Sequence, residues 1–100
     1  MLHTVNKSPF EKNSLQTCLR LSRPGHKVLL IEDGVYGALN HTEHSDALIK
    51  ASEDRQIYVL APDLKARGIE DGQLMDCVQQ VDYNGFVALA AESDKVQSWF

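Results

Sequence analysis

The strongest structural signal in the chain is the stretch Lys27-Val28-Leu29-Leu30-Ile31-Glu32, an unbroken apolar run between two charged residues. A strand that is covered on both faces has this pattern, because neither of its faces can carry polar side chains. A second run of the same kind, Ile57-Tyr58-Val59-Leu60, is closed by Pro62. Both runs favour a parallel sheet buried between layers of helices.

Three weaker segments have the composition of further strands. They are Met1–Val5, Val78–Val81 and Val96–Phe100. Between the five expected strands the apolar spacing becomes helical, and this alternation is typical of βαβ units. We therefore predict a single α/β domain over residues 1–100, a small flavodoxin-like three-layer fold with a mainly parallel sheet of about five strands.

The first helix has two possible starting points. Ser8-Pro9-Phe10-Glu11 has the form of a capping box, with Ser at the N-cap, Pro at the first helical position and Glu at the third. Asn13 or Ser14 could equally start the helix one turn later. In either case Arg23-Pro24-Gly25 ends it.

The later helices are marked by capping residues. We expect one interrupted helix or two short ones over residues 34–40 and 45–52. Asp63 is expected to cap a short helix that closes at Gly68, because glycine readily adopts the left-handed C′ conformation. Asp82 or Asn84 is expected to cap the last helix.

Composition and charge exclude several classes of protein. The 100 residues carry a formal net charge of −4 and contain no Lys/Arg run, which argues against direct nucleic-acid binding. The longest apolar stretch is far shorter than the ~20 residues that cross a bilayer. With two cysteines and no signal-peptide pattern at the N-terminus, we expect reduced thiols and a cytoplasmic location.

In parallel α/β sheets, ligands and partners gather at the carboxyl ends of the strands. The loops expected there are Asn6-Lys7-Ser8, Glu32-Asp33-Gly34 and Ala61-Pro62-Asp63. They lack the glycine-rich phosphate-binding motifs, so a nucleotide cofactor is not expected. A receiver-like signalling domain is a remote alternative, because Asn6-Lys7 stands where acidic residues would be needed. Glu32-Asp33 is more simply interpreted as a turn in which Gly34 supplies an unusual φ.

The histidines do not predict a metal site. His41 and His44 flank Glu43 and are three residues apart, a spacing at which two helical side chains can share a ligand. The segment is polar, however, and no second pair of ligands accompanies it. We expect these side chains to be solvated and predict no metal.

Cys18 is the candidate catalytic residue. It shares a helical stripe with Leu15 and Leu19, which favours a small buried hydrophobe. The alternative is a persulfide-carrying thiol, whose pKa would have to be lowered by nearby cations. The cations that are close in sequence are Arg20, Arg23 and His26. Cys77 is a weaker candidate for such a thiol.

The chain ends in two large aromatic residues, Trp99-Phe100. We expect these side chains to pack at the edge of the core or against a partner.

Four segments stand out as motifs in a fixed order along the chain. They are Leu2-His3-Thr4-Val5-Asn6-Lys7-Ser8-Pro9-Phe10, Leu30-Ile31-Glu32-Asp33-Gly34-Val35-Tyr36, Tyr58-Val59-Leu60-Ala61-Pro62-Asp63-Leu64-Lys65-Ala66-Arg67-Gly68 and Val81-Asp82-Tyr83-Asn84-Gly85-Phe86-Val87. In this order they resemble the DsrH/TusB family. Together they span nearly the whole chain, and the resemblance is greatest to the DsrH branch.

The resemblance implies a function. Family members assemble with DsrE-like and DsrF-like subunits (TusD and TusC in the tRNA-thiolating branch) into a hexamer of two heterotrimers. The complex passes persulfide sulfur to a DsrC-like (TusE-like) acceptor, and the principal sulfur-carrying cysteine belongs to the DsrE-like chain. Cys18 matches a cysteine of the DsrH branch that TusB proteins commonly lack.

On this basis we expect a subunit of a DsrEFH-like sulfur-relay complex of sulfur oxidation. This chain would serve mainly in assembly and docking, with accessory sulfur binding at Cys18. Two alternatives are a TusB-like subunit for tRNA 2-thiouridine synthesis and a sulfurtransferase that uses Cys18 as its carrier. Lys65 and Arg67 are candidates for electrostatic contacts with partner subunits, or for a solvated face.

Overall fold

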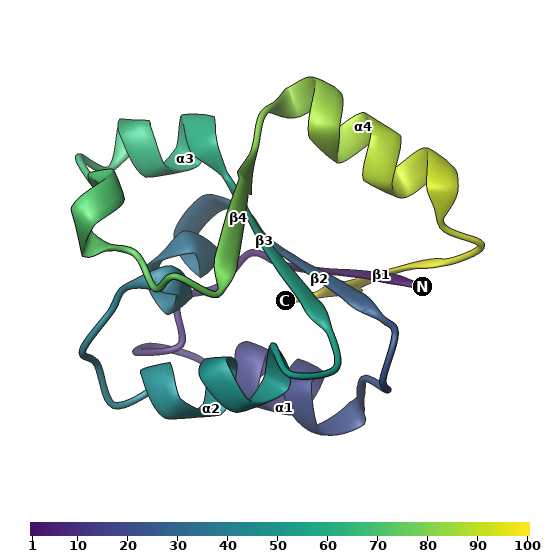
Figure 1. Cartoon of the computed structure of the whole chain (residues 1–100), viewed down its shortest axis with the longest axis horizontal. Coiled ribbons are helices and arrows are strands. Elements are labelled where there is room, and N and C mark those ends of the chain that lie inside the picture. Colours follow the sequence, from purple (N-terminus) through teal and green to yellow (C-terminus); the bar gives the residue numbers. More distant parts are fainter.

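The computed structural model describes all 100 residues of the chain. The strands are β1 (Leu2–Val5), β2 (Lys27–Leu30), β3 (Gln56–Leu60), β4 (Val78–Val81) and β5 (Val96–Trp99). The helices are α1 (Ser14–Leu21), α2 (Ser45–Ala51), α3 (Ala61–Ala66) and α4 (Tyr83–Glu92), with 3₁₀ segments η1 (Glu32–Ala38) and η2 (Asp71–Gln73) (Figure 1). The five expected strands are therefore confirmed, and residues 32–51 form two separate elements.

The sheet has the strand order β4-β3-β2-β1-β5, and every neighbouring pair is parallel. The chain steps outward from β1 to β4 and then returns to the far side of β1, where it adds β5. The point at which the strand order reverses therefore lies beside β1. The three-layer α/β prediction is confirmed, with a sheet that is wholly parallel.

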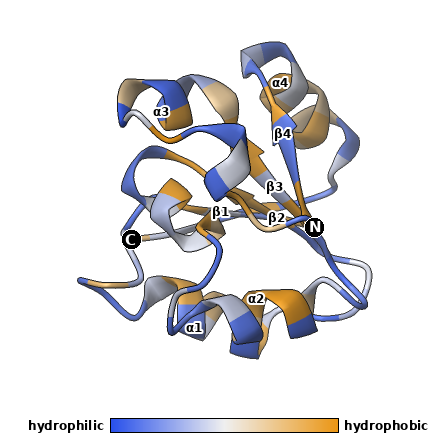
Figure 2. Cartoon of the chain, turned by 60° about the vertical axis from the view of Figure 1, so that its left-hand side comes forward, coloured by the Kyte–Doolittle hydropathy of each residue, from blue (hydrophilic) through white to orange (hydrophobic).

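The two faces of the sheet are covered unequally. Helices α1 and α2 lie on one face, and their apolar side chains join those of α3, η1 and the strands in a core cluster of 14 buried residues (Figures 1 and 2). Helix α4 lies on the opposite face over a smaller cluster of Leu2, Leu29 and Leu89. A single helix therefore packs on the second face of the sheet and covers it only in part.

The first helix starts at the later of its two expected points, and the expected start of α3 is wrong. Helix α1 begins at Ser14, and the Ser8 hydroxyl instead accepts a hydrogen bond from the Phe10 N–H, at 3.2 Å, in a separate turn. Helix α3 begins at Ala61, directly after β3, so Asp63 lies within its first turn and is not its cap. Pro62 is compatible with this start because the first helical turn needs no N–H there.

Two other capping predictions are confirmed. The Asp82 carboxylate accepts a hydrogen bond from the Gly85 N–H at 2.8 Å at the start of α4. Gly68 follows the end of α3 with a φ of +68°, the left-handed conformation that glycine adopts without strain. None of the helices is long and apolar enough to cross a membrane.

Candidate functional site

The loops at the carboxyl ends of β2 and β3 are tied together by hydrogen bonds. The Glu32 N–H donates to Oδ2 of Asp63 at 2.6 Å. The Arg67 guanidinium donates to Oδ1 of Asp33 at 2.9 and 3.0 Å and to the Asp63 carbonyl at 3.1 Å. Arg67 thus bridges two loops of this chain, and the carboxylates of Asp33 and Asp63 are engaged within it.

Gly34 explains how the loop after β2 meets the end of β1. A Cβ at this position would lie 2.1 Å from the Val5 carbonyl oxygen, so only glycine fits. The positive φ of this turn belongs to Glu32, at +50°, and not to Gly34. The expectation that Gly34 supplies the unusual φ is therefore wrong, because the glycine is needed for close backbone approach.

The loops after β1, β2 and β3 thus meet at the carboxyl ends of the strands, as the parallel topology requires. Beside them, Oδ1 of Asn6 at the end of β1 is buried without a hydrogen-bond partner. At this end of the sheet, Asp33, Asp63 and Arg67 are thus joined in one hydrogen-bonded group.

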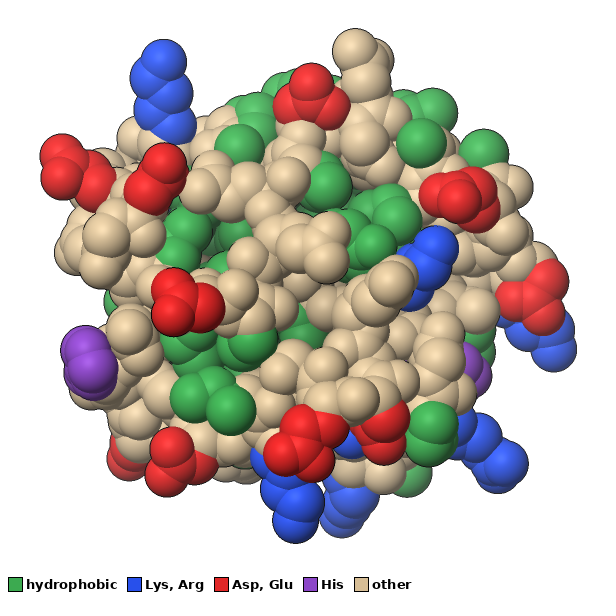
Figure 3. Space-filling view, in the orientation of Figure 1, with side chains coloured by type: hydrophobic (Ala, Val, Ile, Leu, Met, Phe, Trp, Pro, Cys, Tyr) green, Lys and Arg blue, Asp and Glu red, His purple; other side chains and the backbone are tan.

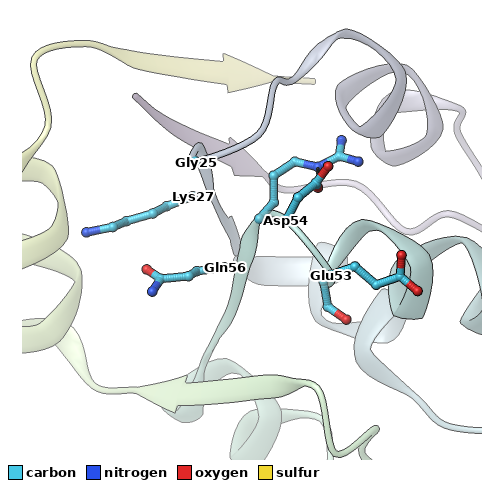
Figure 4. Close-up of a pocket in the computed structure, with 7 residues that line it drawn as sticks. Gly25, Lys27, Glu53, Asp54 and Gln56 are labelled. Carbon is cyan, nitrogen blue, oxygen red and sulfur yellow. Dashed lines mark hydrogen bonds and ion pairs between the residues drawn. The ribbon is translucent and has the colours of Figure 1, made fainter.

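The largest hollow lies at the opposite end of the sheet. It has a volume of about 480 Å³, and the residues that line it are Gly25, Lys27, Ser52, Glu53, Asp54, Arg55 and Gln56. Figure 4 shows that Lys27 and Gln56 point to one side of the strands while Glu53 points away from them. Because these side chains point in different directions, they are not arranged to bind one ligand together.

Cys18 lies on the inner side of α1 and is fully buried in the core. Burial raises the pKa of its thiol to about 12, and the positive charge of Arg55 offsets this only in part. In this conformation the thiol is protonated at neutral pH and has no access to solvent. Cys77, just before β4, is half-buried, and neither cysteine is in a disulfide.

The cation near Cys18 is one that sequence proximity did not indicate. Arg55 lies just before β3, and its guanidinium donates to the Leu19 carbonyl at 2.5 Å and to the Ser22 hydroxyl at 2.8 Å. It therefore caps the C-terminus of α1, where free carbonyls attract a positive charge. Arg20, by contrast, lines a shallow hollow on the outer side of α1.

A second group that the sequence did not reveal joins His3, His26 and Trp99. The Trp99 indole N–H donates to Nδ1 of His3 at 3.0 Å, and Nε2 of His3 lies 3.0 Å from Nδ1 of His26. The Arg23 backbone N–H, 3.2 Å away, also donates to His26 Nδ1. Both Nδ1 atoms are acceptors, so the His3 proton lies on Nε2. The sequence signal that could have indicated this group is His3, a histidine within the mainly apolar first strand.

The other sequence candidates stay apart from these groups. His44 packs edge-on against Phe10, with ring centroids 4.8 Å apart, and its Nε2 lies 3.5 Å from the Glu43 carboxylate. At the C-terminus, Trp99 packs against the core whereas Phe100 is 78% exposed. Only the first of the two terminal aromatics is therefore docked within this chain.

Comparison with known sequences decides the family. The sequence model of the family described as "DsrH like protein" matches residues 7–96. The chain belongs to the DsrH-like family. Among curated relatives of this DsrH-like chain, Protein TusB of Erwinia tasmaniensis is 39% identical over 99 residues, covering 99% of this chain and all of the relative. Protein TusB of Shigella flexneri is 33% identical with the same coverage.

Solved structures agree on the fold. The ychN protein of E. coli superposes on the DsrH-like chain with a TM-score of 0.78 at 19% identity, covering 97% of each chain. Protein MTH1491 of Methanobacterium thermoautotrophicum gives a TM-score of 0.75 at 14% identity, covering 97% of this chain and 96% of the other. At these identities the likeness concerns the fold alone.

Proposed function

We propose that this chain is a subunit of a cytoplasmic sulfur-relay complex that supplies sulfur for 2-thiouridine in tRNA. The observation that carries the proposal is the full-length similarity to proteins named TusB, at 33–39% identity. This similarity favours tRNA thiolation over the sulfur-oxidation role that the DsrH-like motifs first suggested. The partners are TusD-like and TusC-like (DsrE-like and DsrF-like) subunits, in a hexamer of two heterotrimers, and a TusE-like (DsrC-like) acceptor.

Within that complex the chain acts in assembly and docking and is not the main sulfur carrier. The burial of Cys18 and its pKa of about 12 support this role, because only an accessible thiolate attacks sulfur readily. The loops that follow β1, β2 and β3, at residues 6–8, 32–34 and 61–63, also contain no cysteine that could carry sulfur.

The alternative in which Cys18 carries sulfur has a definite chemistry. The Cys18 thiolate would attack the outer sulfur of a partner's persulfide, forming the Cys18 S–S bond, breaking the partner's S–S bond and releasing the partner's thiolate. The step needs no oxidant, but it needs α1 to open from the core so that the thiol can deprotonate.

The pathway is tested by deleting the gene for this chain in its own host and measuring 2-thiouridine in digested tRNA by mass spectrometry. We expect 2-thiouridine to fall and to return with the wild-type gene. Unchanged 2-thiouridine, together with lost growth on reduced sulfur, would overturn tRNA thiolation in favour of sulfur oxidation.

The carrier question is tested by intact-mass spectrometry of the chain, alone and in its reconstituted hexamer, after exposure to a sulfane-sulfur donor. We expect no added sulfur on this chain while the TusD-like subunit becomes loaded. The control variants are Cys18→Ser and Cys18→Ala, of which the alanine avoids placing an unpaired hydroxyl in the core. A reducible gain of one sulfur that both variants abolish would establish Cys18 as a carrier.

A further inference from the structure

Helix α4 is apolar on the side that faces solvent as well as on the side that faces the sheet. No charged residue occurs between Tyr83 and Ala91. Phe86, Leu89 and Ala90 contact the sheet-side cluster, whereas Tyr83 and Val87 are 60% and 67% exposed. A helix that is hydrophobic all round is normally buried all round. The outer side of α4 therefore lacks a cover in the isolated chain.

The exposed residues form one stripe. Tyr83, Val87 and Ala91 are spaced four residues apart, so they lie one above another along the helix, and all three are exposed. We call these three residues the α4 patch. Figure 3 shows hydrophobic side chains gathered over this helix, in the upper right of the view. Val96, 50% exposed on β5, pairs with Leu2 and extends the apolar surface on the same face of the sheet.

The charged residues at the two ends of α4 are both acidic. Between Gly68 and Asp94 the chain has no Lys, Arg or His, and it has six acidic residues: Glu70, Asp71, Asp76, Asp82, Glu92 and Asp94. Asp82 and Glu92 bracket α4 at its two ends. Asp94, in the loop to β5, is paired with the N-terminal amino group of Met1 at 3.4 Å, and Lys95 follows it. The α4 patch is therefore an apolar stripe with one carboxylate at each end, and we call these two carboxylates its acidic rim.

We propose that the α4 patch is the surface on which this chain docks a heterologous subunit of its complex, through an apolar face that is rimmed by Lys or Arg. This inference rests on the proposed function for the existence of such a subunit. A second copy of the chain fits poorly, because a two-fold contact through α4 would set acidic rims against each other. Anionic membranes and tRNA would be repelled by the same carboxylates.

The test is co-expression of this chain with its own TusD-like and TusC-like subunits, followed by recovery through a tag on the TusD-like chain. The variants Val87→Glu and Tyr83→Glu replace exposed residues, so the chain is expected to fold, which circular dichroism and thermal melting will check. We expect each variant to reduce the recovered fraction about ten-fold or more, as the loss of a central interface contact does. The matched control is Ile49→Glu, which places the same charge at a 46% exposed position of α2.

The charge argument is tested by Glu92→Lys. We expect weaker assembly at low salt than for the wild type and a smaller difference at high salt, since rim charges act through screened attraction. Unchanged or stronger assembly of Glu92→Lys would overturn the basic character assigned to the partner.

The outcomes separate the two proposals. If the wild-type chain is not recovered with the tagged TusD-like subunit, the proposed function fails. If the wild type assembles and the Val87→Glu and Tyr83→Glu variants assemble equally well, only the α4 patch fails. Equal loss by Ile49→Glu would also overturn the assignment to α4. A dimer of the isolated wild-type chain that Val87→Glu converts to monomer would assign the patch to a second copy instead.

Discussion

The indole N–H of Trp99 donates to Nδ1 of His3 at 3.0 Å, joining the last strand of the chain to the first. Because Trp can only donate, this contact requires an unprotonated Nδ1 on His3. His3 is buried, and burial lowers its pKa below the ordinary 6.5, with further lowering from His26, the N-terminal amino group and Arg55. The neutral imidazole is therefore part of what holds β5 against β1.

Stability is expected to fall in mild acid because of His3. In the unfolded chain His3 takes up a proton near pH 6.5, whereas in the folded chain it does so only at lower pH. The unfolded state thus binds more protons below pH 6.5, so the free energy of unfolding decreases as the pH falls from 6.5 toward the folded pKa. Urea unfolding at a series of pH values measures this slope.

The variant His3→Gln provides the control for that slope. It lacks the titrating group, so its free energy of unfolding is expected to be lower than that of the wild type at pH 7.5 and to depend less on pH between 7.5 and 5.5. If the wild type and His3→Gln lose stability in parallel as the pH falls, the effect belongs to another group.

Gly34→Ala is expected to destabilise the fold strongly. Its Cβ would meet the Val5 carbonyl oxygen at 2.1 Å. Neither backbone segment can move freely, because Val5 ends the interior strand β1 and Gly34 is buried in η1. We expect a loss of about 3 kcal/mol in the free energy of unfolding, typical of severe overpacking. Gly72→Ala is the matched control, since nothing lies within 4 Å of its Cβ, and thermal or urea unfolding of both variants makes the comparison.

Much of the fold could be predicted from sequence because the relevant signals are local. The apolar runs of β2 and β3 and the cap at Asp82 depend on residues within a few positions of each other. The role of Gly34 could not be predicted, because it depends on Val5, which is distant in sequence and contributes a backbone oxygen.

The candidate site was predicted less completely for the same reason. Sequence proximity pointed to Arg20 and Arg23 as the cations near Cys18. The cation that reaches the end of α1 is instead Arg55, which lies 36 residues after Leu19 in the chain. The bond between His3 and Trp99 likewise joins residues 96 positions apart. Only the strand order of the sheet brings such groups together.

Arg55→Met is expected to weaken the end of α1. The substitution keeps much of the side-chain volume but leaves the Leu19 carbonyl and the Ser22 hydroxyl without their donor. The Arg55 side chain is only 14% exposed, so we expect a loss of about 1–3 kcal/mol in the free energy of unfolding. Arg20→Met on the exposed side of α1 serves as control, with a change of about 0.5 kcal/mol or less. Similar losses from both variants would argue against a capping role.

The two cysteines are expected to differ sharply in reactivity. A thiol whose pKa is about 12 is a thiolate in roughly one part in ten thousand at pH 8, and Cys18 is also closed to solvent. Iodoacetamide should therefore label the half-buried Cys77 first, and should reach Cys18 only through opening of α1. Peptide mass spectrometry over a time course separates the sites, and labelling in urea gives the reference in which both react alike. Fast native labelling of Cys18 would mean that α1 opens readily, and the sulfur-carrier role of this chain would then become the better explanation.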